Sequence, residues 1–398
     1  MRLGFYYHIP AVSKADGIYM PGYLGRFIDS LAGLCEQVVC FQHSPRPDEL
    51  EQMDYRIASP NVEWVNIGPH DNVLTRTFFA SRYTRHLRAY AGKLDVLLVR
   101  GPSPLLPAMV SASPMPTALL LVGDYLKGID DLPQPRWRKE AIRLWSRWNK
   151  WAQLRAARGS LTFVNSRVLY EELFPHVSNL QEIRTTTLTK TDFFERQDTC
   201  QSGPPYKLLY VGRIDRAKGL MNMAEAVALL ARKGEDVSLD LVGWPEPGEP
   251  ILDDLQVYAR QHGIEERINY LGGRSMGEEL FACYRAADLY LIASMASEGF
   301  PRTIWEAMAN SLPVITTDVG SIRYLLNGNA VIVPPNRPDL LSEAILHLIY
   351  NKNLRQKLIK AGFEQAKSMT LELQTQKLYQ FMQHYCANYK NFSKGTKQ

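Results

Sequence analysis

Residues 294–320, SMASEGFPRTIWEAMANSLPVITTDVG, place an acidic loop, a helix start and a β-branched run in direct succession. The preceding run LYLIAS is short and apolar on both faces, which is typical of a strand buried on both sides. Pro301 stands just before a helix-forming stretch, so we predict a helix beginning at Arg302 or Thr303. The run PVITTD predicts another strand. The order strand, loop, helix, strand is a βαβ unit, and its loop carries Glu298 at the strand end where open α/β sheets bind ligands.

The same alternation fills the rest of the second half of the chain. We expect strands at residues 207–212, 238–243, 268–272 and 288–294, with helices at 220–234, 253–263 and 276–287 between them. Strands and helices that alternate at this rhythm predict a parallel sheet covered by helices.

The first half repeats the pattern less regularly. Strands are expected at residues 2–7, 37–42, 95–100, 117–122 and 160–165. The segment 8–22 is predicted to be a loop before a helix at 23–35, and its Gly17 would let the backbone approach a ligand. GxGxxG is absent there, so the loop is no dinucleotide fingerprint. The proline-rich segment 101–116 predicts a loop and a short helix.

These patterns predict two Rossmann-like, doubly wound α/β domains. A length of 398 residues suits two domains of ordinary size. We place the first at residues 1–196, a polar, turn-rich linker (QDTCQSGPPY) at 197–206 and the second at 207–370. Residues 371–398 carry a long helix pattern that we expect to cross back to the first domain.

Composition excludes several classes of protein. The chain is 45% hydrophobic and 22% charged, as in ordinary globular proteins, and its aliphatic runs fall short of the ~18 residues that a bilayer span needs. The start, MRLGFYYHIP, resembles a first strand more than a signal peptide, so we expect a cytoplasmic protein. The five scattered cysteines favour reduced thiols. A net charge of +5 leaves any preference for an anionic partner to a local cluster.

Arg213 and Lys218 follow directly from the strand at 207–212, in the sequence YVGRIDRAKGL. Two cations at a sheet edge beside a helix start form a site for a diphosphate, because their charges and the backbone N–H groups favour anions. The competing interpretation is that both cations are surface ion-pair partners in a loop that also holds Asp215 and Arg216.

Glu298 and Glu306 supply carboxylates that can accept hydrogen bonds from sugar and ribose hydroxyls. For Glu306 an equally good interpretation is a capping box, since Thr303 stands three residues before it. For Glu298 the alternative is an exposed loop acid.

Three ordered motifs carry a resemblance to a known family. G-R-x4-K-G (212–219), EGFP-x4-EAMA (298–309) and PVI-x-TDVG (313–320), together with YLGGRSMGEEL, resemble the family-4 retaining glycosyltransferases of GT-B fold. The match covers most of the second half, whereas the first half shares only the strand rhythm and the glycine loop.

The resemblance implies a role for each matching residue. Arg213 and Lys218 would hold the diphosphate of a nucleotide-sugar donor. Glu306 would hold the ribose and Glu298 the transferred sugar. Further contacts are implied at the backbone of Gly299 and Phe300, at Gly273 and Arg274 beside the base, and at Gly17 facing the interdomain cleft. Transfer would proceed by front-face attack, with the leaving diphosphate helping to take the acceptor's proton.

One position departs from the family pattern. After the strand ALLLV the family often places a histidine near the reacting sugar, but this chain has Gly123-Asp124. Asp124 is a candidate for a polar contact there, and capping of a turn before Tyr125 is an equal alternative. No D-x-D follows a strand, so we expect no catalytic metal and no cofactor other than the donor substrate.

Residues 136–158, RWRKEAIRLWSRWNKWAQLRAAR, combine eight Arg or Lys residues with four tryptophans. On a helix, Leu144, Trp145, Trp148, Trp151 and Ala152 share one face, as in helices that lie on anionic lipid. The alternative is that the tryptophans pack in the first domain's core. A single basic cluster without a reader fold argues against nucleic-acid binding.

The sequence therefore predicts a retaining glycosyltransferase that moves a sugar from a nucleoside-diphosphate sugar to an acceptor glycan or lipid-linked glycan, resting peripherally on a membrane. Its rivals are an inverting or phosphorylase-type enzyme of the same fold and a non-catalytic nucleotide- or glycan-binding subunit.

Overall fold

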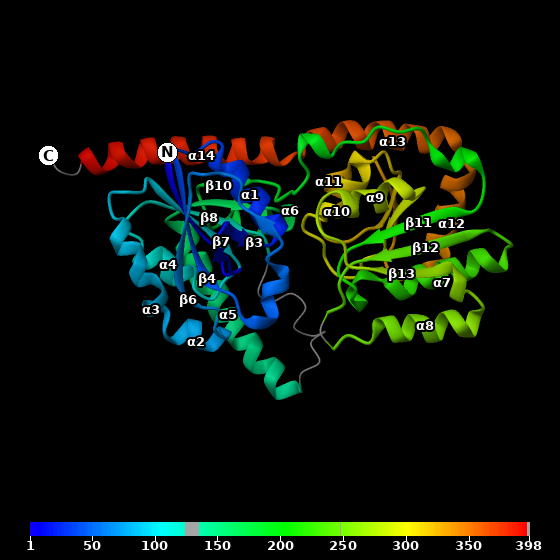
Figure 1. Ribbon diagram of the computed structural model, residues 1–398, viewed down its shortest axis with the longest axis horizontal. Coiled ribbons are helices and arrows are strands. Elements are labelled where there is room, and N and C mark those ends of the chain that lie inside the picture. The colour runs from blue at the N-terminus through cyan, green and yellow to red at the C-terminus, as the bar shows by residue number, and fades with distance from the viewer. Residues whose placement is uncertain (124–134, 247, 396–398) are drawn as a thin grey trace. The chain divides into compact units, whose positions relative to one another are not determined.

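The computed structural model of the chain describes residues 1–123, 135–246 and 248–395. Contacts divide the chain into two compact units, Met1–Thr187 with Leu371–Gln398 and Leu188–Thr370. Each unit has its own parallel sheet and hydrophobic core (Figure 1).

The N-terminal unit is built on a seven-stranded sheet in the order β10-β9-β8-β7-β1-β4-β6, in which every neighbouring pair is parallel. Its strands are β1 (Arg2–Tyr6), β4 (Gln37–Ser44), β6 (Val62–Pro69), β7 (Val96–Gly101), β8 (Thr117–Leu121), β9 (Leu161–Val164) and β10 (Leu180–Glu182). The predicted strands of the first half are confirmed, and β6 and β10 are additional.

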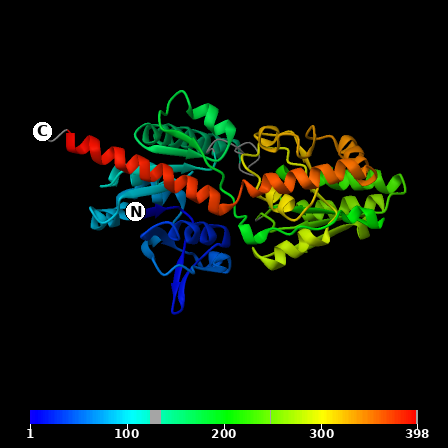
Figure 2. The ribbon, with the colours of Figure 1, turned by 90° about the horizontal axis from the view of Figure 1, so that it is seen from above.

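Helices cover both faces of this sheet, which makes it doubly wound. One core cluster joins the sheet to α1 (Gly22–Ala32) and α14 (Leu371–Gly395), and the other joins it to α4 (Leu106–Ala112), α5 (Arg136–Arg158) and α6 (Arg167–Leu173). Two shorter helices, α2 (Val73–Phe78) and α3 (Ala80–Thr84), follow β6. The helix predicted after residue 371 is α14, shown in red along this unit in Figure 2.

The segment predicted to be a loop between β1 and the first helix is an antiparallel hairpin. Strands β2 (Val12–Lys14) and β3 (Gly17–Met20) pair with each other, and β3 also pairs with β5 (Tyr55–Arg56). Gly17 opens β3 opposite Lys14, and a Cβ there would lie 2.9 Å from Arg56 Nε. The prediction of an open glycine loop is therefore wrong, because a tight turn and two cross-strand partners order the segment.

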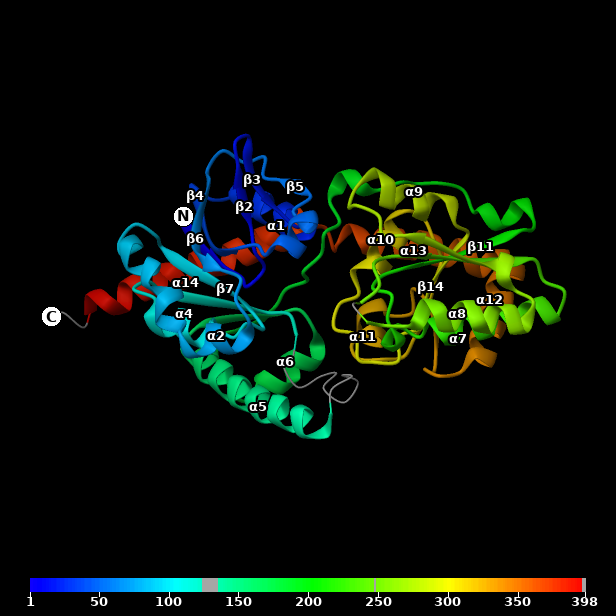
Figure 3. The ribbon, with the colours of Figure 1, turned by 60° about the horizontal axis from the view of Figure 1, so that its bottom comes forward.

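The C-terminal unit carries a six-stranded parallel sheet in the order β13-β12-β11-β14-β15-β16. Its strands are β11 (Tyr206–Val211), β12 (Val237–Val242), β13 (Ile268–Gly272), β14 (Leu289–Ile292), β15 (Val314–Thr317) and β16 (Val331–Val333). Its helices are α7 (Leu220–Arg232), α8 (Ile251–His262), α9 (Glu278–Ala286), α10 (Arg302–Ala309), α11 (Ile322–Leu326), α12 (Pro338–Tyr350) and α13 (Lys352–Lys367). Figure 3 shows how these helices surround the sheet.

The segment 197–206 is packed onto the C-terminal unit and does not separate the two units. Cys200 is buried, and Asp198 pairs with Arg355 Nε at 2.9 Å with only 4% of either side chain exposed. Thr199 donates a hydrogen bond to Asp288. The polar, turn-rich composition that suggested a linker instead reflects buried ionic contacts, and the division between the units lies at Thr187 and Leu188.

Candidate functional site

The predicted donor-site residues gather at one edge of the C-terminal sheet. Because the strands are parallel, their carboxyl ends meet there. Arg213 and Lys218 follow β11, Gly273 and Arg274 follow β13, and Glu298 follows β14. Residues that lie far apart in sequence are thus brought to the same side of one unit.

Lys218 and Glu298 form the central pair of this site. Lys218 Nζ lies 2.6 Å from Glu298 Oε1, and the side chains are 18% and 15% exposed. The Ser294 hydroxyl donates a second hydrogen bond to the same oxygen at 2.6 Å. Glu298 is therefore held in place and partly shielded, so its interpretation as an exposed loop acid is wrong.

Two glycines allow the surrounding loops to approach closely enough for this pair. Gly219 has φ of +69°, and a Cβ on it would lie 1.9 Å from the carbonyl oxygen of Ala293. Gly320 has φ of +60°, and a Cβ there would lie 2.2 Å from the carbonyl oxygen of Glu298. Any larger residue would force the loops apart at both positions.

Arg213 is more exposed than Lys218 and has ion-pair partners in its own unit. Its Nη1 lies 2.8 Å from Glu246 Oε1 and its Nη2 lies 3.5 Å from Asp215 Oδ2, while 63% of the side chain is exposed. In this structure Arg213 is therefore a surface ion-pair partner, as the competing interpretation expects. A bound anion would have to compete with these two carboxylates.

Glu306 lies inside α10 and is only 2% exposed. The helix begins at Arg302 after Pro301, so Glu306 is beyond the third helical position and the capping-box interpretation is wrong. Tyr284 instead donates a hydrogen bond to Glu306 Oε2 at 2.8 Å. Burial, followed by the charge of Glu306, raises the pKa of Tyr284 well above its ordinary value, so the phenol keeps the proton that it donates.

The loop residues between these carboxylates are packed differently from one another. The ring of Phe300 is 8% exposed and stacks on Trp305 with ring centroids 5.5 Å apart. The Phe300 side chain therefore anchors the loop in the core. Gly299 precedes it and contributes only backbone.

Trp244 is a further candidate site residue, which the sequence did not suggest. A Cβ on Gly273 would lie 2.1 Å from its indole, and yet 61% of Trp244 is exposed. Arg274 Nη1 donates to the Gly273 carbonyl oxygen at 3.3 Å. Trp244 stands two residues after β12, the strand beside β13, and this position was the available signal. A flat aromatic surface at this sheet edge suits the base of a nucleotide.

Two other predicted residues are not among those gathered at this sheet edge in the described structure. Gly17 belongs to the N-terminal unit, and Asp124 falls outside the described residues. Within the described ranges no cluster of three or more His, Cys, Asp or Glu residues has the arrangement of a metal site.

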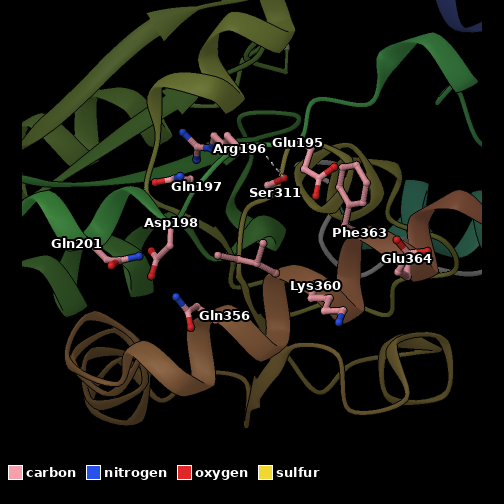
Figure 4. Close-up of a pocket in the computed structure, with 11 residues that line it drawn as sticks. Glu195, Arg196, Gln197, Asp198, Gln201, Ser311, Gln356, Lys360, Phe363 and Glu364 are labelled. Carbon is pink, nitrogen blue, oxygen red and sulfur yellow. Dashed lines mark hydrogen bonds between the residues drawn. The ribbon is translucent and has the colours of Figure 1, made fainter.

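A separate pocket of about 420 Å³ lies between α13 and the segment around Asp198 (Figure 4). Arg196 and Ser311 line it, and the Arg196 amide donates to Ser311 Oγ at 3.3 Å. The pocket contains none of the predicted donor-site residues.

Helix α5 exposes most of its tryptophans. Trp137, Trp148 and Trp151 are 73%, 52% and 57% exposed, and Leu144 is 71% exposed. The buried face consists of small or polar residues, Ser146, Asn149, Ala152, Gln153 and Ala157. The interpretation of these three tryptophans as core residues is therefore wrong. Across the described ranges, no helix is long and apolar enough to span a bilayer.

Comparison with known proteins matches the C-terminal unit to a family. Residues 192–365 match the family model described as "Glycosyl transferases group 1". Phosphatidyl-myo-inositol mannosyltransferase from Mycobacterium leprae is 29% identical over 160 residues, which is 39% of this chain and 41% of that protein. The match thus spans well under half of that relative's length.

Solved structures match over nearly the whole chain. Anabaena Alr3699/HepE in complex with UDP has a TM-score of 0.72 at 17% identity, covering 96% of this chain and all of that chain. Sucrose-phosphate synthase from Thermosynechococcus elongatus has a TM-score of 0.71 at 18% identity, covering 97% of this chain and all of that chain. The fold is GT-B, with two Rossmann-like units, as the sequence predicts.

Proposed function

We propose that this protein is a retaining glycosyltransferase that moves a sugar from a nucleoside-diphosphate sugar to an acceptor glycan or lipid-linked glycan, and that its motifs are those of family 4. The Lys218–Glu298 pair at the sheet edge is the observation that carries the proposal. The family-model match and a GT-B neighbour solved with UDP and with UDP-glucose support it.

Donor binding would rearrange the central ion pair. Lys218 exchanges Glu298 for a diphosphate oxygen, and Arg213 binds the same group in place of Glu246. Glu298 is then free to accept hydrogen bonds from the hydroxyls of the transferred sugar. Tyr284 orients Glu306 toward the ribose, and Trp244 with Gly273 and Arg274 forms the surface against the base.

The transfer step needs no protein nucleophile in this proposal. The bond between the sugar's anomeric carbon and the diphosphate oxygen breaks, and the acceptor oxygen attacks from the same face. The acceptor's hydroxyl proton passes to the leaving diphosphate. Lys218 and Arg213 stabilise the negative charge that develops on the leaving group.

The central test combines binding with turnover. A thermal-shift panel of nucleoside diphosphates and their sugars first identifies the donor, since a ligand that favours the native state raises Tm. Lys218→Ala and Glu298→Ala are each expected to lower kcat/KM for transfer or donor hydrolysis by about 10²-fold or more. Lys233→Ala, which alters an exposed cation at the far end of α7, is the matched control. Wild-type rates in both site variants would refute the assignment.

The rivals have their own outcomes. Product NMR that shows an inverted anomeric centre would exclude retention, and a requirement for free phosphate would indicate a phosphorylase. Donor binding without transfer or hydrolysis would favour a non-catalytic subunit.

We also propose that α5 rests on the cytoplasmic face of an anionic membrane. Its exposed tryptophans lie beside exposed arginines such as Arg147 and Arg155, and Arg155 lies 5.8 Å from the Trp151 ring centroid. Aromatics with flanking cations suit the headgroup region. An acceptor held in that membrane would then meet the enzyme at its N-terminal unit.

A further inference from the structure

Basic side chains gather at the carboxyl ends of four neighbouring strands of the N-terminal sheet. His8 follows β1, His43 lies near the end of β4, His70 follows β6 and Arg100 lies near the end of β7. Arg76 reaches the same group from α2, and its charge acts on His8, His43 and His70. This edge is where an open α/β sheet binds ligands.

Arg76 is the member of this basic cluster whose guanidinium lacks hydrogen-bond acceptors. The residue is 5% exposed, and its Nε and Nη1 are buried without a hydrogen-bond acceptor. Throughout the described residues its guanidinium has neither a hydrogen bond nor an ion pair. Its neighbours on α2 point outward, with Leu74 and Phe78 60% and 79% exposed. A guanidinium buried in this way costs free energy unless an anion pairs with it.

Burial lowers the pKa of all three histidines of the cluster, which favours their neutral form. Burial, then the charge of Arg76, lowers the pKa of both His8 and His43 to about 3. Nε2 of His70 is buried without a partner, whereas the backbone of Gly68 and Pro69 acts on the His43 ring through hydrogen bonds that raise its pKa against the effect of burial. The two rings are 5.5 Å apart. A neutral imidazole still offers one N–H donor.

The acidic side chain that contacts the cluster, Glu49, is already engaged. Glu49 Oε1 lies 2.7 Å from His70 Nδ1 and 3.0 Å from Arg46 Nη2. Since His70 Nδ1 donates to Glu49, its Nε2 is the acceptor nitrogen in the neutral ring. The guanidinium of Arg76 thus keeps donors without an acceptor, and the half-buried His8 marks where the cluster reaches the surface.

We infer that Arg76, beside the histidines of this cluster, forms a binding site for a phosphate-type oxyanion at the carboxyl edge of the N-terminal sheet. The planar guanidinium donates two parallel hydrogen bonds to the anion. Assigning this anion to a phosphate group on the acceptor rests on the proposed function. The site itself does not, because Lys218 and Glu298 belong to the other unit.

Isothermal titration of the full-length protein with inorganic phosphate and with glycerol 3-phosphate tests the site, with glycerol as the uncharged control. The titrations use the Lys218→Ala background, which weakens phosphate binding at the donor site. Arg76→Met is expected to weaken phosphate binding about tenfold or more, because charge-assisted hydrogen bonds are lost. Arg82→Met, which alters an exposed arginine on α3, is the matched control and should bind as the Lys218→Ala parent does.

Thermal unfolding gives a second measurement that does not depend on tight binding. In phosphate-free buffer Arg76→Met should have an unchanged or higher Tm, since it removes an unpaired buried charge. Added phosphate should raise Tm with Arg76 present but not in Arg76→Met. An equal phosphate-induced rise in Tm in Arg76→Met and Arg82→Met would overturn the inference. The inference would also fail if phosphate did not change the Tm of the parent, because ordered water would then be the occupant of the site. Sugar transfer enters neither experiment, so the donor-site proposal can fail without this one.

Discussion

At the scale of single residues, Gly320 links the backbone of the donor site to its chemistry. A Cβ at this position would lie 2.2 Å from the Glu298 carbonyl oxygen, in a left-handed conformation with φ of +60°. We expect Gly320→Ala to lower the free energy of unfolding by about 2–4 kcal/mol, combining backbone strain with overpacking. It should also lower donor affinity, because the Glu298 loop must move.

Gly328→Ala separates these two effects. Gly328 has φ of +85°, and a Cβ added to it would have no neighbouring atom within 4 Å, so only backbone strain of about 1 kcal/mol should appear. Urea unfolding and donor titration of both variants check the prediction. Equal losses in the two variants would show that the contact with Glu298 has no consequence.

His43 provides a pH-dependent prediction for the N-terminal unit. Its folded pKa of about 3 lies below the ordinary 6.5, so between these values the unfolded chain binds a proton that the folded chain does not. Above pH 6.5 His43 therefore does not reduce the free energy of unfolding. As the pH drops from 6.5 toward 3, His43 lowers that free energy by up to about 1.4 kcal/mol per pH unit. Urea midpoints at about pH 6.5 and about pH 4.5 in phosphate-free buffer should differ less for His43→Gln than for the wild type. His384→Gln, which alters an exposed histidine on α14, should change nothing, and an unaltered pH slope in His43→Gln would contradict the prediction.

At the scale of elements, α5 tests the membrane proposal. Replacing both Trp148 and Trp151 by Gln should reduce co-sedimentation with phosphatidylglycerol vesicles at least about tenfold, because burying an aromatic side chain contributes about 1.5–3 kcal/mol. Trp244→Gln alters a similarly exposed tryptophan of the other unit and should bind vesicles normally. Phosphatidylcholine vesicles should bind weakly throughout, since the flanking arginines need anionic lipid. Equal sedimentation of the double variant and the wild type would refute the proposal.

The sequence predicted the regular elements well where apolar periodicity was strong. Strands β11 to β15 and helix α10 lie where the pattern places them, because buried parallel strands are short apolar runs and Pro301 marks a helix start. The hairpin of β2 and β3 was missed, since a glycine-bearing polar segment has the composition of a loop. For α5 the pattern gave the helix but not its buried face, which Ser146, Asn149 and Gln153 form through polar side chains.

The candidate site could be predicted only in part, because some of its residues meet through side-chain packing and not through a spacing in the sequence. The strand-end rule brings Lys218 and Glu298 together, since both follow neighbouring parallel strands. Tyr284 and Trp244 reach the site through side-chain packing that no local spacing reveals. The basic cluster was overlooked although His8, His43 and His70 each lie at a strand end, because single histidines far apart in sequence form no motif.

At the scale of the whole molecule, the chain leaves the N-terminal unit at Thr187 and returns to it at Leu371. Helix α14 then completes the N-terminal core with Leu371, Leu378 and Met382, which are 3%, 0% and 0% exposed. Thr375 on this helix also exchanges a 2.7 Å hydrogen bond with Ser30 on α1. The C-terminal unit has a separate core, and none of the α14 residues whose burial is described belongs to it.

Removing residues 371–398 should therefore destabilise one unit selectively. Loss of three buried apolar side chains, each contributing about 1.5–3 kcal/mol, removes about 4.5–9 kcal/mol, which is comparable to the typical stability of a whole domain, about 5–15 kcal/mol. Hydrogen exchange read by mass spectrometry should show lost protection in β1, β7 and α1, with β11 to β15 unchanged. Donor binding in the C-terminal unit should survive if its fold is independent. A truncation after Tyr389 keeps every buried residue named above and should behave as the full chain does, whereas equal loss of protection in both units would show that they unfold as one.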